Sequence, residues 1–147
     1  MIKGINHLGI VVRNIEEVVA FLRETFGAEE ITRVEFPELR QISAIVRIGD
    51  GCLELMEPTA PDGAVGKFLE TKGGGLHHVS LLCDDVVAMC EKLEAQGLQV
   101  IGKMFEGPVK VAFVHPKSAK EFSSSWPKGP HSTVPSKGPL SFFFLYA

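Results

Sequence analysis

The chain has 147 residues, 45% of them hydrophobic and 22% charged, which is typical of a single globular domain over residues 1–147. Its formal net charge of −3 offers no basic field for a phosphate backbone, so no nucleic-acid partner is expected. No apolar run approaches the ~20 residues of a membrane-spanning helix and no leader segment is recognisable, so we expect a cytoplasmic protein without a membrane partner.

The first predicted element is a strand with a histidine near its start, in the run Ile5-Asn6-His7-Leu8-Gly9-Ile10-Val11-Val12. Asn14, with Glu17 three residues later, is typical of a helix N-cap, and apolar residues then recur at helical spacing up to Gly27. Three more strands are predicted, at 29–35, 42–48 and 52–57, and Gly49-Asp50-Gly51 joins the last two as a hairpin. Residues 1–58 therefore form a predicted β-α-β-β-β module.

A second module repeats the first after a crossover over residues 59–75, which contains a short predicted helix at 67–70. His78 lies 71 positions after His7 (78 − 7) and likewise opens an apolar run, and Asp85 occupies the position of the helix cap. Further strands are predicted at 77–83, 98–103 and 109–114, so residues 76–120 reproduce the order of the first module.

The final part of the chain, residues 121–147, is an atypical tail that departs from this repeat. A last strand is expected soon after His115-Pro116, but a stretch rich in proline, serine and glycine follows. The chain ends in the apolar run Phe142–Tyr146, which either replaces the missing strand or covers a partner surface. The predicted fold class is α+β, with two tandem β-α-β-β-β modules forming a curved mixed sheet around a metal site and the last strand of the second module left open.

Strand alternation indicates a metal site. Side chains two apart share a face of a strand, so His7 and His78 occupy equivalent faces of the two modules. Glu54 lies between two residues that would normally pack in a core, where a carboxylate is costly unless it is paired or binds a metal. The three side chains would make a divalent site with open positions. Two other interpretations stay open: histidines that are only hydrogen-bonded core residues, and a solvated Glu54 with Leu53 and Leu55 inward.

The cysteines and the glycine triplet at 73–75 are predicted to have structural roles. Cys52, Cys83 and Cys90 lack metal-binding spacing and lie in apolar patterns, which is typical of reduced core thiols. The triplet is predicted as a turn rather than a phosphate cradle, and no cofactor-binding residues are assigned.

The chain resembles the vicinal oxygen chelate superfamily of glyoxalases, bleomycin resistance proteins and dioxygenases. Within this superfamily it is most similar to the methylmalonyl-CoA epimerases. The similarity runs from about Ile5 to Ser118. Its most specific pieces are His7-Leu8-Gly9-Ile10, Leu53-Glu54-Leu55-Met56-Glu57-Pro58, Lys67-Phe68-Leu69-Glu70 through Gly75-Leu76-His77-His78, and Val111-Ala112-Phe113-Val114-His115-Pro116-Lys117-Ser118. The resemblance implies His7, Glu54 and His78 as metal ligands.

The resemblance also implies a function: a metal-dependent isomerase that stabilises the enolate of a CoA thioester by chelating two substrate oxygens. The implied cofactor is divalent cobalt, nickel, zinc or manganese, and the implied partners are a small-molecule substrate, an acyl-CoA among the candidates, and a second copy of the chain in a homodimer. The alternatives are lactoylglutathione lyase-like activity, ring-cleaving dioxygenation on iron, and a catalytically silent ligand-binding protein. The acid and base residues are not assigned.

The chain departs from the family pattern at three places. The family's fourth ligand, a glutamate on the last strand, falls on Ser125, and Ser43 occupies a position where some epimerases carry a catalytic carboxylate. The glycine loop before the strand that ends in His-Pro-Lys-Ser is shortened to Glu106-Gly107-Pro108. Codons that encode residues 120–126 can read Gly-Val-Leu-Phe-Glu-Leu in another frame, so we hypothesise that the tail is a frameshifted last strand. The nucleotide sequence of the gene tests this hypothesis.

Overall fold

The computed structural model describes residues 1–106, 110–118 and 141–146. The chain divides into two compact units, one formed by His7–His77 and the other by Met1–Asn6 together with His78–Ala147. Along the chain the elements follow the predicted order twice, with one helix between the two modules, which confirms the α+β class and the tandem β-α-β-β-β repeat. Among the described residues, no helix combines the length and the apolar character needed to cross a membrane.

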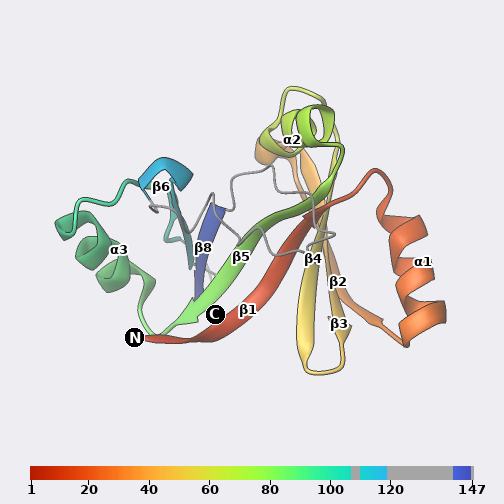
Figure 1. Cartoon of the computed structure of the whole chain (residues 1–147), viewed down its shortest axis with the longest axis horizontal. Helices are drawn as coiled ribbons and strands as arrows, with labels where there is room; N and C mark the ends of the chain where they lie inside the picture. Colours follow the sequence, from red (N-terminus) through yellow and green to blue (C-terminus); the bar gives the residue numbers. More distant parts are fainter. Residues whose placement is uncertain (107–109, 119–140, 147) are drawn as a thin grey trace, which may run out of the picture. The chain divides into compact units, whose positions relative to one another are not determined.

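The first module contains helix α1 and strands β1 to β4, which Figure 1 labels. Its elements are β1 (Ile2–Val11), α1 (Ile15–Phe26), β2 (Glu29–Phe36), β3 (Gln41–Ile48) and β4 (Gly51–Pro58), with a short 3-10 turn at Pro37–Leu39. The strand order is β2-β3-β4-β1. β1 pairs with β4 in parallel, whereas β2, β3 and β4 pair antiparallel. The sheet is therefore mixed, and β1 and β4 are neighbours although 39 residues separate the end of one from the start of the other (51 − 11 − 1).

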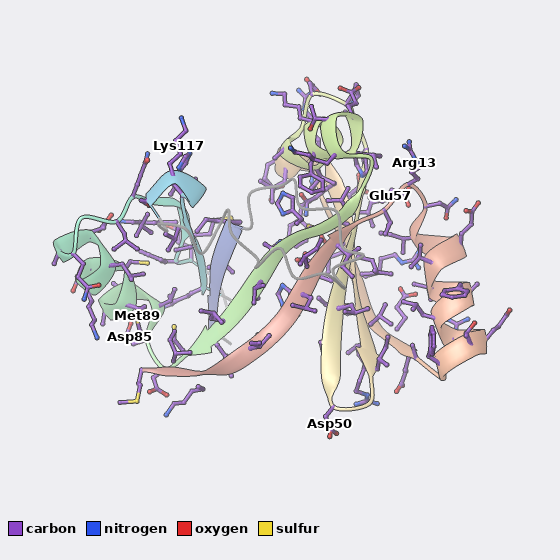
Figure 2. All side chains as sticks on the ribbon, in the orientation of Figure 1. Arg13, Asp50, Glu57, Asp85, Met89 and Lys117 are labelled. Carbon is purple, nitrogen blue, oxygen red and sulfur yellow. The ribbon has the colours of Figure 1, made fainter. Side chains whose placement is uncertain are left out.

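Helix α1 begins and ends where the sequence pattern predicts. The Asn14 side chain accepts a hydrogen bond from the Glu17 amide at 3.1 Å, and Gly27 ends the helix with φ of 66°. A further group, which the pattern did not indicate, stabilises the start of the helix: Glu57 Oε2 accepts a hydrogen bond from the Ile15 amide at 2.7 Å. In Figure 2 the labelled Glu57 lies close to the segment that leads through Arg13 into α1. The end of β4 therefore fixes the start of α1.

Strand β4 is covered on both faces. On one face, which we call the α1 face, Leu55 packs in a core with Ile15 and Val19 of the helix. On the other face Met56 packs with Val11 of β1 and with Val65, the second residue of α2 (Ala64–Lys72). Helix α2 therefore covers the end of this second face at which Met56 lies.

The second module has the same order of elements as the first. They are β5 (Gly75–Cys83), α3 (Val86–Ala95), β6 (Val100–Met104), β7 (Lys110–Val114) and β8 (Ser141–Tyr146). Asp85 caps α3 by accepting hydrogen bonds from the Val87 and Ala88 amides, which confirms the predicted cap; Figure 2 shows it at the start of this helix.

The core of the second module contains two of the three cysteines. Cys83 and Cys90 are buried against Val86, Ala112 and Val114. The structure has all three thiols free, as predicted, with Cys52 half-buried. Burial raises the pKa of both core thiols above the ordinary value, because the charged thiolate would lose its hydration there. These two thiols are therefore held in the unreactive, protonated form.

The last strand is not where the repeat predicts it. Residues Pro116–Ser118 form one turn of 3-10 helix instead of leading directly into a strand. The apolar terminal run supplies the strand: β8 lies between β5, to which it is parallel, and β7, to which it is antiparallel, in the order β5-β8-β7-β6. The interpretation of this run as the replacement strand is confirmed. Residues 107–109 and 119–140, including Ser125 and the proposed frameshift point, lie outside the described residues.

Candidate metal centre

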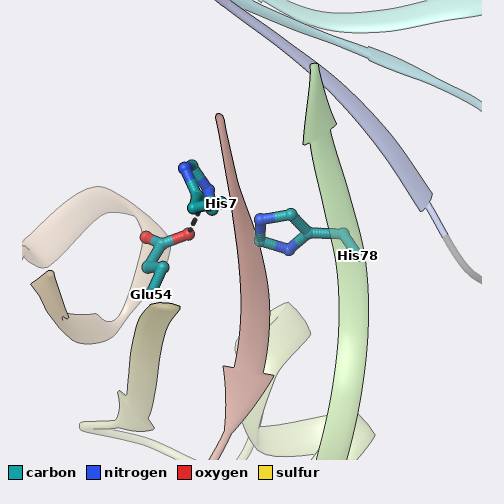
Figure 3. A group of neighbouring side chains, drawn as sticks. All are labelled: His7, Glu54 and His78. Atoms are coloured by element: carbon teal, nitrogen blue, oxygen red, sulfur yellow. Dashed lines mark ion pairs between the residues drawn. The ribbon is translucent and has the colours of Figure 1, made fainter. Parts of the chain in front are cut away.

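His7, which is buried, and Glu54, which is half-buried, form a pair on the neighbouring strands β1 and β4. Gly9 is the partner of Glu54 in the parallel register, so His7, two residues before Gly9, points to the same face. His7 Nε2 lies 3.3 Å from Glu54 Oε2, and their side chains are 6% and 15% exposed. Figure 3 marks this ion pair with a dashed line. The predicted convergence of the two side chains is therefore observed within this unit.

The packing of β4 decides which way Glu54 faces. Leu53 and Leu55 turn to the α1 face, where they pack in the helix-covered core, and Glu54 turns with Met56 to the opposite face. We call this second face, defined by His7, Glu54 and Met56, the donor face. The alternative interpretation is correct for Leu53 and Leu55, which face a core, but wrong for Glu54, because only 15% of its side chain is exposed. A carboxylate with so little access to water needs a compensating partner, and His7 is one.

His78 belongs to the other unit and lies on β5 with no solvent exposure. Ser80 shares its face of the strand and is also fully buried, and among the described residues its hydroxyl has no hydrogen-bond partner. Figure 3 draws His78 together with His7 and Glu54. Among the His, Cys, Asp and Glu side chains of the described residues, these three form the group that could hold a metal ion.

The register of β8 identifies the residue of the second module that is equivalent to Glu54 of the first. Ser80 is the counterpart of Gly9, because the two modules are offset by the 71 positions between His7 and His78. Gly9 pairs with Glu54, and Ser80 pairs with Phe143 in the same parallel geometry. Phe143 therefore occupies the backbone position equivalent to Glu54. The donor set of the described chain is two imidazoles and one carboxylate.

This donor set fits a divalent metal. Imidazole nitrogen suits zinc, cobalt, nickel and iron, and a carboxylate adds the negative charge that stabilises the cation. Buried carboxylate and imidazole groups whose donor atoms approach one another are costly as a bare pair, and a cation between them satisfies both. The residues present therefore fit a divalent metal.

Ser43 and Gln41 are two further polar residues that the fold buries on β3. Ser43 is the partner of Met56 in the antiparallel register, so it lies on the donor face, and Gln41, two residues away, shares that face. The Gln41 Nε2 atom donates a hydrogen bond to Ser43 Oγ at 3.0 Å. The sequence pattern did not single out Gln41; the only signal was two polar residues at alternate positions of an apolar strand.

The fold and the site together define a paired β-α-β-β-β protein with an imidazole–carboxylate centre on its inner strands. The family model of the glyoxalase/bleomycin resistance protein/dioxygenase superfamily matches residues 6–114. The chain belongs to this superfamily.

The chain is similar to several epimerases and to other members of the superfamily. The ethylmalonyl-CoA/methylmalonyl-CoA epimerase of Cereibacter sphaeroides is 30% identical over 122 residues, which cover 80% of this chain and 91% of that protein. The uncharacterized protein YqjC of Bacillus subtilis is 31% identical over 116 residues, which cover 77% of this chain and 83% of that protein. The structure of Streptomyces coelicolor methylmalonyl-CoA epimerase in complex with 2-nitronate-propionyl-CoA superposes with a TM-score of 0.82 at 25% identity, covering 100% of this chain and 99% of that one.

Proposed function

We propose that this protein is a metal-dependent epimerase that moves the α-proton of an acyl-CoA thioester. The observation that carries the proposal is the His7–Glu54 pair on adjacent inner strands. Membership of the superfamily and the similarity to methylmalonyl-CoA epimerases support the reaction class. The acyl-CoA substrate is supported by the names of these relatives and by the CoA ligand of the Streptomyces coelicolor enzyme.

The proposed ligands are His7, Glu54 and His78, and the proposed ion is divalent cobalt, nickel, zinc or manganese. Such an ion supplies a Lewis acid that binds two substrate oxygens and stabilises the negative charge developing as the α-proton leaves. Glu54 supplies the negative charge that retains the cation, and the two histidines supply neutral nitrogen donors. Val11, Met56 and Val65 form an apolar wall beside these donors, which keeps water away and strengthens the local electrostatic interactions.

The acid and base steps place a further demand on the site. Inversion at the α-carbon needs a proton acceptor on one face and a donor on the other. Ser43 stands where the family resemblance puts one of these carboxylates, so this position does not supply the base. The proposal therefore assigns the metal ligands and leaves the proton-transfer groups to be found by kinetics.

Ring-cleaving dioxygenation is the second candidate function, and one observation favours it. Phe143 at the position equivalent to Glu54 leaves a set of two histidines and one carboxylate. This set with open positions is the one that non-haem ferrous oxygenases use. Bound iron together with oxygen uptake would identify this activity in place of the epimerase.

The test combines metal content with proton exchange. The purified protein is exposed to each metal in turn, its bound metal is measured by mass spectrometry, and deuterium uptake at the α-carbon of methylmalonyl-CoA is followed by NMR in heavy water. We expect close to one metal ion per chain in the unmodified protein. His7→Ala, Glu54→Ala and His78→Ala should each lower the metal affinity by more than about tenfold, because ligands contribute more than the outer-shell groups for which such losses are typical.

A matched control is His115→Ala, which removes a histidine outside the proposed ligand set that accepts a hydrogen bond from the Lys117 amide. It should retain the metal and the exchange activity. Unchanged metal content in all three ligand variants would contradict the proposed centre, and a metal-loaded protein that exchanges no α-proton would contradict the proposed reaction.

A further inference from the structure

Gln41 and Ser43 are a buried polar pair in a strand that otherwise packs with apolar side chains. Gln41 is 8% exposed and Ser43 is 5% exposed, and they are joined by a hydrogen bond of 3.0 Å. Burial of a polar side chain is costly unless its hydrogen-bonding groups are satisfied. An amide and a hydroxyl together have more donors and acceptors than one mutual bond uses. The pair therefore has unused polar groups in a region with little access to water.

The sheet register places this pair next to the metal centre. Ile45 is the partner of Glu54, and Ser43 is the partner of Met56, one step further along the same face. Glu54 and Ser43 are thus diagonal neighbours on adjacent strands, about 7–8 Å apart by the geometry of antiparallel pairs. A substrate atom held next to Glu54 would have its neighbouring atoms within reach of the Ser43 hydroxyl.

The direction of the hydrogen bond sets what Ser43 can bind. Because the Gln41 amide is the donor, Ser43 Oγ is the acceptor and its own proton is directed elsewhere. Ser43 therefore has an O–H group on the donor face that is available to donate, and the hydrogen bond from Gln41 holds its oxygen in place. A neutral O–H donor binds an oxygen with negative charge, whereas a carboxylate at this position would repel it.

We propose that Ser43, held by Gln41, binds a carboxylate oxygen of the substrate and selects acyl-CoA thioesters that carry a carboxylate on the α-carbon. The inference rests on the proposed function. A malonyl-type thioester has three oxygens near the reacting carbon: the thioester oxygen and two carboxylate oxygens. A metal held by the proposed ligands would bind two of them, and the third would need a donor of its own. Ser43 is the specificity residue in contact with this oxygen, and Gln41 is its positioning residue.

The test compares two ligands that differ only in the carboxylate. Malonyl-CoA and propionyl-CoA are titrated by calorimetry into the metal-loaded protein and into Ser43→Ala, Ser43→Thr and Gln41→Leu. We expect Ser43→Ala to lower the affinity for malonyl-CoA about tenfold, which equals about 1.4 kcal/mol. The affinity for propionyl-CoA should change by less than about twofold. Ser43→Thr keeps the hydroxyl and should retain the selectivity. Gln41→Leu should lower the affinity for malonyl-CoA alone, by about threefold, because the Ser43 hydroxyl stays but loses the hydrogen bond that positions it.

A purely structural role of the pair predicts a different result. Loss of packing or of sheet stability would weaken both ligands equally, and Ser43→Thr would then be no better than Ser43→Ala. Equal changes for the two ligands, or no change for either, overturn the subsite. A hydroxyl elsewhere serves as control: Thr71→Ala removes the Oγ that donates to the Lys67 carbonyl on α2 and should alter neither affinity.

Metal content, measured on the same samples, separates the two possible failures. A fully loaded protein that does not distinguish the ligands overturns the subsite and leaves the metal centre standing. A protein that takes up no metal overturns the proposed function. In that case the subsite is still supported if the protein prefers malonyl-CoA and Ser43→Ala removes this preference. If the protein shows no such preference, the subsite is overturned.

Discussion

Gly66, near the start of α2, is a position where an added methyl group should destabilise the protein. Gly66 is buried, and a Cβ built on it would lie 2.7 Å from the Pro61 carbonyl oxygen and closer still to that of Ala60. Contacts below 3.0 Å essentially never occur for real Cβ atoms. Both obstacles are backbone oxygens, so no side chain can rotate away to relieve the overlap. The loop over residues 60 and 61 or the helix must move.

The expected loss follows from two opposing terms. Alanine favours a helix interior over glycine by about 1 kcal/mol, so an unobstructed Gly66→Ala would be stabilising. Overpacking of this kind costs typically 1–3 kcal/mol, and contacts with rigid backbone place it near the upper end. We therefore expect a net loss of about 2 kcal/mol in the free energy of unfolding, which lowers the melting temperature by roughly 4–8 °C for a chain of this size.

The assay is urea unfolding followed by far-ultraviolet circular dichroism, with Gly4→Ala as the control. Gly4 has nothing within 4 Å of a built Cβ, so its replacement should change the stability by less than about 0.5 kcal/mol. Val65 next to Gly66 packs on Met56 beside the metal centre, so weaker metal binding should accompany the lost stability. A Gly66→Ala protein as stable as the wild type, or more stable, would refute the reasoning.

Three further predictions concern other parts of the chain. Glu57→Ala should cost about 1 kcal/mol in urea unfolding, because the Ile15 amide at the start of α1 loses its acceptor; an unchanged midpoint would contradict this role. Phe143→Glu should strengthen zinc binding at least about tenfold in a competition with a chelator, since it adds an acid at the register position equivalent to Glu54, whereas Phe142→Glu, at the register position of Val79, should not. The thiols of Cys83 and Cys90, whose pKa burial raises, should react with an aromatic disulfide at pH 8 only after unfolding; rapid reaction in the native protein would refute their burial.

The candidate site was partly predictable, and β4 shows why only partly. Alternation placed Glu54 opposite Leu53 and Leu55, but it could not say which face was inward. Both faces turned out to be covered, since Leu55 packs under α1 and Met56 packs under α2. Alternation of apolar and polar residues identifies the inward face only when one face of a strand is buried. It cannot do so for a strand that is buried on both faces. What remained informative was the cost of burying a carboxylate.

The last strand was less predictable than the first helix. The Asn14 cap and Gly27 end of α1 depend on neighbouring residues, so local chemistry was sufficient to predict them. β8 is defined instead by pairing with β5 and β7, which precede it by more than 25 residues in the chain. No local signal carries such a register. The Gln41–Ser43 pair was missed for a related reason, because its burial depends on the neighbouring strand and not on its own sequence.

The two units differ in how early during translation all of their strands become available for pairing. His7–His77 is one continuous stretch, so all of its strand pairs can form while the rest of the chain is still being made. The other unit needs the chain's first six residues and its final strand, and that strand lies in the middle of its sheet. Until residues 141–146 emerge, β5 and β7 keep open edges that can pair with other chains. A chaperone that binds nascent strands should therefore be needed most between the synthesis of β7 and the emergence of β8.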